Sequence, residues 1–363
     1  MSTSISGYFN ADTVYFSSNL PSLTISSDRK AVNVRILLDG VVILSEAYYP
    51  DSFGRFNLYD IGDLAAHHMQ TVGSIYGLLR IEAEESSREM TVVCCSRHVG
   101  MLPSLFLRRH FLTTCHPKLL GPDDVDFLTS PIMPDENRHI ACEVGYSRDG
   151  KSDNYRYTVI DQPNDNRHFQ TVSIGVSPRA ARERIASLVG CRPAEIRIHY
   201  LTFTSYSRHQ TYMVGEQSPN LRLLFRNAFN CLELASLHCS VTEKLKATAQ
   251  SAISQRGYEL YDRTSEQTYE VEAANLPIAV AQWLRQLVDS HDVQLVNGDY
   301  DPDDGDWHIF DEVQITDSTS ETLIGDAELS KLKFTYRYLP AKPRLEVEDT
   351  DRIHTAPFDA MFT

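Results

Sequence analysis

The sequence lacks the residue spacings that usually mark metal sites and reactive thiols. Its seven cysteines are scattered and odd in number, with no Cys-x-x-Cys pair, and its thirteen histidines form no His-Glu-x-x-His or His-x-His pattern. Zinc sites generally depend on such spacings. We therefore expect no metal and no cofactor, and we interpret the cysteines as reduced, mostly buried thiols of a chain that folds in the cytoplasm.

Motifs for nucleophilic catalysis and for phosphate binding are also missing. The segment "GYSRDG" (145–150) has the wrong spacing for a Gly-x-Ser-x-Gly elbow, and no glycine-rich phosphate loop follows a predicted strand. These absences favour a protein that is not an enzyme. A hydrolase stays open as a third hypothesis, because two catalytic carboxylates need only meet in space and the sequence does not show whether they do.

Long apolar runs and basic runs are absent as well. No run approaches the roughly 18 apolar residues of a membrane-spanning helix. Residues 1–16 have neither a basic nor an apolar stretch, so we expect no cleaved signal peptide. The net charge is -15 and no Lys/Arg run exceeds two residues, so we expect neither nucleic acid nor an anionic membrane as a partner.

Short runs of alternating polar and apolar residues dominate what is present. The clearest is residues 32–48, where Asp39-Gly40 separates two such runs, as in a tight β-hairpin. Hydrophobic residues make up 42% of the 363 residues, enough for two or three buried cores. We predict a mostly β (α+β) fold, with antiparallel β-sandwich domains and a few short helices.

A segment rich in proline and acidic residues, 117–137, is the best candidate for a linker. With this linker, we predict that the chain has four parts: an N-terminal β-sandwich domain (1–118), a middle β-rich domain with one helix (119–219), a C-terminal α+β domain (220–340) and an extended acidic tail (341–363).

Three helices are predicted. The first covers residues 60–70, with Leu64 and Met69 facing inward. The second has Ser177 as its N-cap and Gly190 at its end, with Pro178 at the first helical position. Its predicted apolar stripe is Ala181, Ile185, Leu188 and Val189. The third is capped by Asn275, and its apolar face comprises Val280, Trp283, Leu284, Leu287 and Val288.

Strands are predicted, or are one of two alternatives, for three further segments. Residues 104–112 are predicted as a strand and residues 258–273 as a hairpin. Residues 221–240 fit either one amphipathic helix or two strands joined by a turn at 226–230. Asn227 and Asn230 favour the turn, because asparagine forms helices poorly and its side chain hydrogen-bonds to the local backbone.

Two clusters of carboxylates could carry chemistry. One is Asp123, Asp124 and Asp126, and the other lies in the loop 297–307. That loop begins like a calcium-binding EF-hand, but Gly305 is one position late and Phe310 replaces the required glutamate. We favour a solvated loop between strands, and calcium binding at this loop stays an open alternative.

A loose motif in the C-terminal region carries a resemblance to a known family. A strand leads into an aromatic-x-Asn-x-aromatic turn and a second strand, then come a Tyr-Glu-Val segment and a helix with Trp-Leu-x-x-Leu-x-x-Ser. The matching residues are Phe225, Asn227, Phe229, Tyr269, Glu270, Val271, Trp283, Leu284, Leu287 and Ser290. This region resembles tail-tip or baseplate proteins, similar to distal tail proteins, of tailed phages and prophages of gut bacteria. Residues 34–61 resemble their opening β-sandwich, and 119–215 match nothing in the family.

The resemblance implies strand, turn and strand for residues 221–240, although Asn230 stands where the family has glycine. It also implies a structural, non-enzymatic component of a phage-like tail tip, baseplate or related injection machine. Such a protein acts through ring assembly, as a homo-oligomer in contact with other tail proteins, and it belongs to a virion or phage-like particle. The alternative is a carbohydrate-binding or adhesion module on a β-sandwich scaffold, which would contact glycans through exposed aromatic residues or through the 297–307 loop.

Overall fold

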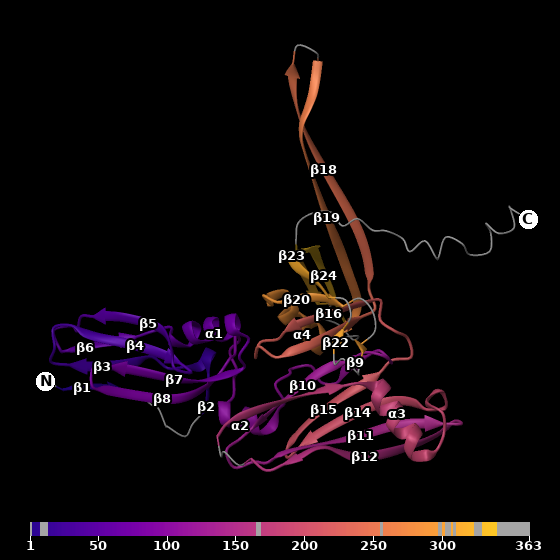
Figure 1. Ribbon diagram of the computed structural model, residues 1–363, viewed down its shortest axis with the longest axis horizontal. Coiled ribbons are helices and arrows are strands. Elements are labelled where there is room, and N and C mark those ends of the chain that lie inside the picture. The colour runs from indigo at the N-terminus through magenta and orange to yellow at the C-terminus, as the bar shows by residue number, and fades with distance from the viewer. Residues whose placement is uncertain are drawn as a thin grey trace, which may run out of the picture.

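The prediction of a mostly β fold with antiparallel sheets and a few short helices is confirmed. The computed structural model describes residues 2–7, 14–164, 168–254, 257–296, 300–301, 306–307, 310–322 and 329–339 (Figure 1). The predicted tail 341–363 therefore lies outside the described residues. None of the described helices has the length and apolar character needed to cross a membrane.

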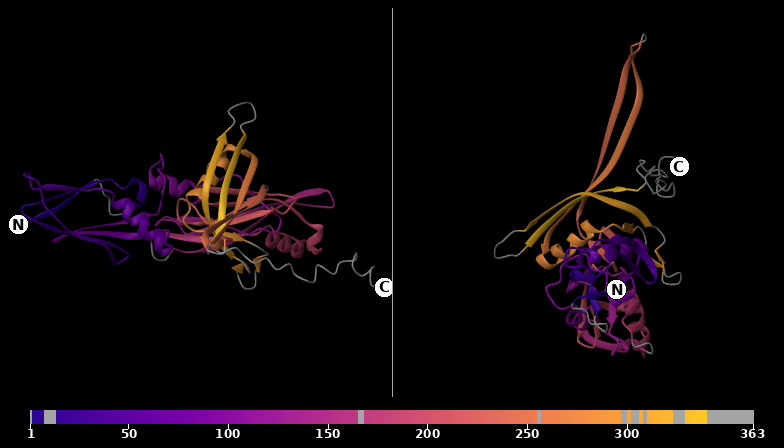
Figure 2. Two further views of the ribbon diagram at one scale, coloured as in Figure 1. Left: turned by 90° about the horizontal axis from the view of Figure 1, so that it is seen from above. Right: turned by 90° about the vertical axis from the view of Figure 1, so that its left-hand side faces the viewer.

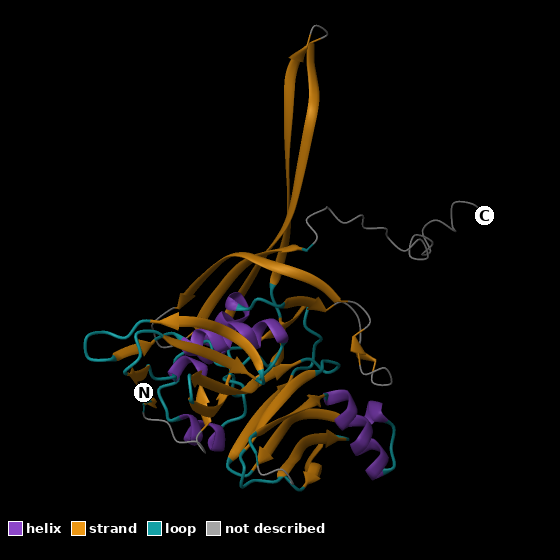
Figure 3. Ribbon diagram, turned by 60° about the vertical axis from the view of Figure 1, so that its left-hand side comes forward, coloured by secondary structure: helices purple, strands orange, loops and turns teal. Residues whose placement is uncertain are grey.

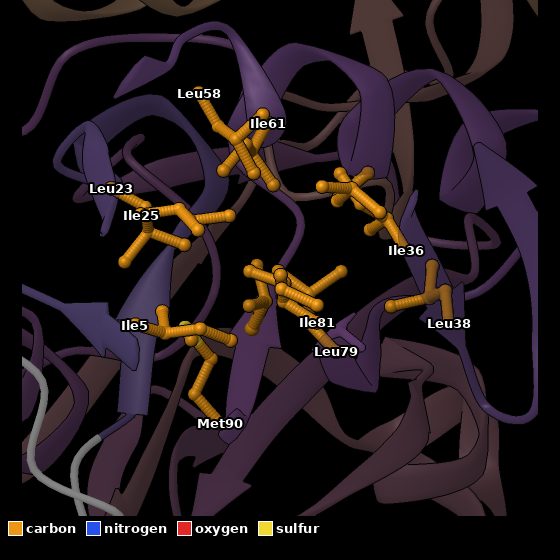
Figure 4. Packing of buried hydrophobic residues seen from close by; sticks show 14 of the residues in the cluster. Ile5, Leu23, Ile25, Ile36, Leu38, Leu58, Ile61, Leu79, Ile81 and Met90 are labelled. Carbon is orange, nitrogen blue, oxygen red and sulfur yellow. The ribbon is translucent and has the colours of Figure 1, made fainter. Parts of the chain in front are cut away.

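The N-terminal part consists of two sheets that share one core. The sheets have the strand orders β1-β3-β6 and β2-β8-β7-β4-β5. Figure 4 shows side chains from both sheets meeting in the core, among them Ile25, Ile36 and Ile81. The elements are β1 (Thr3–Ser6), β2 (Val14–Phe16), β3 (Leu23–Ser27), β4 (Val32–Leu38), β5 (Val41–Tyr48), β6 (Arg55–Leu58), α1 (Ile61–Val72), β7 (Tyr76–Ala83) and β8 (Ser86–Val93).

Two local predictions in this part are confirmed. Strands β4 and β5 form the expected hairpin, with Asp39 and Gly40 at φ values of 50° and 83°. These positive values are what a two-residue turn of the mirror-image type requires. Helix α1 forms where it was predicted, with Met69 fully buried and Leu64 packed against the core.

The strand predicted at residues 104–112 is wrong, because this segment forms helix α2 (Pro103–Arg109). Proline occupies the first turn, where its missing N–H costs nothing, and Arg108 lies in the last turn, where a cation is favourable. The helix buries Leu107 and brings Phe106 against Phe16, with ring centroids 5.5 Å apart.

The middle part contains a five-stranded sheet, β12-β11-β14-β15-β9, and a separate pair, β10-β13. The elements are β9 (Lys118–Leu120), β10 (Asp126–Ile132), β11 (Arg138–Arg148), β12 (Lys151–Gln162), β13 (Gln170–Val176), α3 (Pro178–Val189), β14 (Arg197–Ser205) and β15 (Arg208–Val214).

Residues 117–137 are not a linker. They contain the whole of β9 and β10, and much of the segment is buried, including Lys118, Asp124 and Asp126. Proline and aspartate usually indicate an exposed loop, but here Asp126 is paired with Lys118 of the same segment and Asp124 with the distant Arg222.

Helix α3 begins and ends as predicted. Ser177 Oγ accepts a hydrogen bond from the Ala180 N–H, and Gly190 ends the helix at a φ of 65°. The predicted apolar stripe is only half right: Ala181 and Ile185 are buried, whereas Leu188 and Val189 are exposed. The contacts of the helix with the core end at Ala186, so the last turn is exposed as a whole.

The C-terminal part is built on a seven-stranded sheet with the order β17-β16-β20-β23-β24-β19-β18. Figure 2 shows this sheet with a long hairpin extending from it. The elements are β16 (Leu221–Arg226), β17 (Leu232–Leu237), β18 (Ser240–Ser254), β19 (Gly257–Pro277), α4 (Ile278–Asp289), β20 (Val293–Val296), β21 (Tyr300–Asp301), β22 (Asp306–Trp307), β23 (Phe310–Thr322) and β24 (Leu329–Tyr338).

Residues 221–240 form strand, turn and strand, as the resemblance and the two asparagines implied. Strands β16 and β17 pair in antiparallel register from Leu221↔Leu237 to Arg226↔Leu232. Asn227 Oδ1 accepts hydrogen bonds from the N–H groups of Phe229 and Cys231. Asn230 takes the left-handed conformation, at a φ of 60°.

Two predictions near helix α4 are wrong. Residues 258–273 do not form a hairpin of their own, because they belong to the single strand β19, which pairs with β18. Asn275 does not cap the helix: Pro277 stands at the N-cap, and Asn275, at a φ of 58°, lies where the register with β24 shifts between Ala273 and Leu276. The helix itself forms as predicted and buries Trp283, Leu284 and Leu287.

Candidate functional site

A long two-stranded hairpin extends beyond the rest of the C-terminal sheet (Figures 1 and 3). Strands β18 and β19 pair from Ser240↔Glu272 to Ser254↔Gly257, with one shift of register between Gln250 and Ser251. On its other edge, β19 pairs with β24 only between Tyr269 and Pro277. We call β18 together with residues 257–268 of β19 the arm.

One face of the arm, which we call the apolar face, carries exposed apolar side chains interrupted by a carboxylate. Because side chains alternate along a strand, Val241, Leu245 and Ala247 share this face with Glu243, which accepts a hydrogen bond from Gln267 of β19. Val241 lies opposite Val271, which is fully buried in the core of the sheet, so this face continues the core side of the sheet past the body. Val241 and Leu245 are 40% and 65% exposed, so the apolar face is uncovered.

The opposite face of the arm is charged. Lys246 lies opposite Glu266 in the register, and Lys244 forms an ion pair with Glu270. This hydrogen bond from Lys244 holds the pKa of the Glu270 carboxyl below its usual value. The arm therefore has two chemically different faces, although neither contributes to the core of the protein.

A buried ionic cluster lies among the strands at the base of the arm. Lys118 Nζ is 2.7 Å from Asp126 Oδ2 and 3.1 Å from Glu233 Oε2. Trp283 Nε1 donates a hydrogen bond of 2.7 Å to Glu233 Oε2, and the Lys118 ammonium lies 4.5 Å from the centroid of the Trp283 ring. Asn227 Nδ2 donates to Glu233 Oε1. The cluster thus connects β9, β10, β17 and α4.

Burial and the neighbouring charges together determine the protonation of this cluster. Burial raises the pKa of Asp126, which favours its neutral form. Burial alone would lower the pKa of Lys118, but Asp126 and Glu233 outweigh it, so the pKa of Lys118 is raised and the ammonium is favoured. The cluster of one ammonium and two carboxyl groups has no net charge when one of the carboxyl groups keeps its proton. A buried site tolerates this arrangement because no charge is left without a partner.

The predicted carboxylate cluster at 123–126 is used for structural contacts. Asp124 Oδ1 accepts a hydrogen bond of 2.6 Å from Arg222 Nε, and Asp124 Oδ2 accepts one of 2.6 Å from Ser236 Oγ. Asp123 Oδ1 lies 3.3 Å from Arg182 Nη2. Asp124 and Asp126 therefore join the middle part of the chain to the C-terminal sheet, and their oxygens are engaged with protein groups.

An apolar pocket of about 360 Å³ opens beside the base of the arm. Its lining includes Leu119, Met213, Leu276, Pro277, Val280 and Trp283. Cys115 also lines it, and burial raises the pKa of that thiol to about 12. A thiol with this pKa is protonated at neutral pH and is a weak nucleophile. The apolar part of this lining suits an apolar group of a ligand, and Lys118 and His238 add polar groups to the pocket.

Two other buried thiols, Cys94 and Cys142, and the partly buried Cys239 are also protonated at neutral pH. Burial raises the pKa of Cys94 and of Cys142 to about 12, and that of Cys239 to about 11. Within the described ranges, no group of three or more His, Cys, Asp or Glu residues is placed to hold a metal ion. The candidate calcium loop at 297–307 lies mostly outside those ranges, apart from the short strands β21 and β22.

Most residues of the family motif lie together in the core below the arm. Phe225, Tyr269, Val271, Trp283, Leu284 and Leu287 belong to one buried cluster. Phe225 contacts Trp283 with ring centroids 5.6 Å apart. Phe229 instead packs against Phe16 in a cluster shared with the N-terminal part. Ser290 Oγ accepts a hydrogen bond from the Arg226 N–H and donates one to the Asp292 carbonyl.

The N-terminal part displays exposed aromatic side chains. Tyr49, Phe53 and Tyr59 are 76%, 83% and 65% exposed. The Phe53 and Arg55 N–H groups both donate to Asp51 Oδ1, which fixes the turn that carries Phe53. Exposed rings on an ordered turn are the kind of surface that the alternative glycan-binding hypothesis requires.

Sequence reasoning missed the two features that define this site. The strand β18 was not predicted, although Val241 and Leu245 alternate with Lys244 and Lys246 in a weak strand pattern. The buried role of Lys118 was missed as well, because its partner Glu233 is 115 residues away. No spacing in the sequence indicates that contact.

The chain was also compared with known proteins. No model of a protein family matches it, and the search of curated proteins finds no similar protein.

Proposed function

We propose that this protein is a non-enzymatic structural component of a phage-like tail tip, baseplate or related injection machine, and that it acts by assembling into rings with copies of itself and with other tail proteins. The arm is the observation that carries this proposal. Its apolar face, with Leu245 65% exposed, has no role in the fold of one chain and is suited to contact with another subunit.

Two further observations support assembly as the function. The motif residues on which the resemblance to distal tail-like proteins rests lie in the core that positions the arm, with Tyr269 and Val271 at its root. The ionic cluster around Lys118 ties this core to the middle part of the chain. A projecting element on a firmly connected base is well suited to bear contacts between subunits.

Electron microscopy of particles from the producing cells tests this function. We expect the chain to oligomerise when purified and to co-purify with tail-like particles, at whose tip it can be located. Absence of the chain from every particle fraction, together with a strictly monomeric purified protein, would contradict the proposal.

A second candidate function, binding of a glycan, rests on Tyr49, Phe53 and Tyr59. Exposed aromatic rings can stack on sugars. Calorimetry with a set of glycans, with and without calcium, distinguishes the two functions. Binding that is abolished by Phe53→Ala or Tyr59→Ala would favour the glycan-binding module, and calcium dependence would point to the 297–307 loop instead.

A further inference from the structure

The arm has two backbone edges that no strand of the described chain covers. One is the outer edge of β18, from Ser240 to Ser254, and the other is the edge of β19 over residues 257–268. An uncovered strand edge presents N–H and C=O groups in the spacing that another strand requires. Added strands are therefore a natural partner for the arm.

The charges on the arm select which strand can be added. On the charged face, β18 carries Lys244 and Lys246, whereas β19 carries Glu266 and Glu270. Opposite charges on neighbouring strands stabilise a sheet, and like charges destabilise it. A second β18 placed against β18 would oppose lysine with lysine, and a second β19 against β19 would oppose glutamate with glutamate. A β18 edge next to a β19 edge alternates the charges.

The direction of the strands agrees with this choice. Strands β18 and β19 are antiparallel within one arm. When two arms lie side by side and point the same way, β18 of one copy is antiparallel to β19 of the next. The pairing between copies then repeats the pairing within the hairpin, with its charges and its apolar face on the same sides.

We propose that the partner of the arm is a second copy of this chain, and that β18 of each copy pairs antiparallel with the free edge of β19 in its neighbour. This inference rests on the proposed ring-forming function and specifies its contact. The same contact, made head to tail, uses a different edge on each copy, so repetition can close a ring. The faces that carry Val241, Glu243 and Leu245 then lie on the same side of the joined sheet.

Exchange of one charge pair tests the proposal. The double variant Lys246→Glu, Glu266→Lys keeps opposite charges across the hairpin, because these residues face each other in the register. It loses the contact of Glu266 with Arg337 at 3.8 Å, which is between exposed groups and weak. We expect the variant to assemble alone as the natural sequence does. In mixtures, each contact between the two forms would be about fivefold less populated than random mixing gives, because it opposes like charges.

The matched control exchanges a charge pair away from the arm. Arg80 and Glu89 face each other across β7 and β8 and are similarly exposed, so Arg80→Glu, Glu89→Arg mixed with the natural sequence should give a random distribution. Native mass spectrometry of differentially labelled full-length chains measures both distributions.

The single variants give an independent readout. Lys246→Glu alone and Glu266→Lys alone should each assemble less, and mixing the two should restore assembly, since every contact between them pairs opposite charges. Random mixing of the double variant with the natural sequence, or no rescue between the single variants, would overturn the edge pairing while leaving ring formation intact. A natural sequence that stays monomeric would overturn the proposed function together with this contact.

Discussion

At the scale of single residues, the most consequential position is Lys118. Its ammonium is the shared partner of Asp126 and Glu233, and all three side chains are almost completely buried. A buried charge is tolerated only while it is paired. The base of the arm therefore depends on one side chain that the sequence places in an apparently exposed, proline-rich segment.

Lys118→Met is expected to destabilise the protein by about 3–5 kcal/mol, because it leaves the two buried carboxyl groups without their cation. Urea unfolding followed by circular dichroism measures the change. Lys244→Met is the matched control, since its ion pair with Glu270 is exposed and should contribute little. Equal stability of the two variants would show that the cluster is not essential to the fold.

Asp126→Asn is expected to flatten the dependence of stability on pH. Burial raises the folded-state pKa of Asp126 above its ordinary value of 3.8. The neutral carboxyl is thus favoured in the fold, and its contribution to stability is complete below that value and is lost as the pH rises through the raised pKa. As the pH rises through the range in which Asp126 loses its proton, the natural protein should lose stability relative to the variant. Urea unfolding at a series of pH values measures this difference. A parallel pH dependence of the two proteins would contradict the raised pKa.

At the scale of elements, the arm carries the functional argument. Its β18 strand is exposed along residues 241–250 and contributes little to the core, so packing in the core does not determine these side chains. Yet Val241 and Leu245 stand on one face, together with Glu243, and Lys244 and Lys246 stand on the other. Such a division of faces is expected where a second surface covers the apolar side.

Leu245→Asp is expected to leave the stability of the monomer within about 0.5 kcal/mol, because the side chain is largely exposed, and to weaken assembly. Leu188→Asp, on the exposed last turn of α3, is the matched control and should change neither property. Sedimentation velocity across a concentration series measures assembly, and thermal unfolding measures stability. Identical sedimentation of the two variants would rule out the apolar face as a contact.

Elements set by local chemistry could be predicted from the sequence. The turn at Asp39-Gly40, the Ser177 cap of α3 and the asparagines between β16 and β17 each specify their geometry through neighbouring backbone groups. Helix α2 was mistaken for a strand because its short apolar run fits both periods. Strand β18 was missed because a strand exposed on both sides lacks the strong apolar alternation of a half-buried one.

Less of the candidate site than of the secondary structure could be predicted from the sequence, because the site is formed by tertiary contacts. The sequence singled out Phe225, Trp283 and the other motif residues, but the buried cluster that they build was not visible in it. Arg222 meets Asp124 across 98 residues, and Trp283 meets Glu233 across 50. The sequence marks charged residues as candidates for exposure, and only their distant partners make burial favourable.

At the scale of the whole molecule, the body and the arm have different roles. Separate buried clusters lie in the N-terminal, middle and C-terminal parts, and a further cluster around Phe16 and Phe229 joins the first part to the others. Figure 3 shows the arm standing away from all of them. Stability should therefore reside in the body, and association in the arm.

The measurement that tests this division most directly is the mass in solution of the full chain and of a chain without its arm. Deletion of residues 244–268, with Asn-Gly joining Glu243 to Tyr269, retains a directly opposed pair of residues and supplies a suitable tight turn. Light scattering should find the full chain as an oligomer and the shortened chain as a folded monomer with cooperative unfolding. An oligomer of unchanged subunit number after the deletion would contradict assembly through the arm.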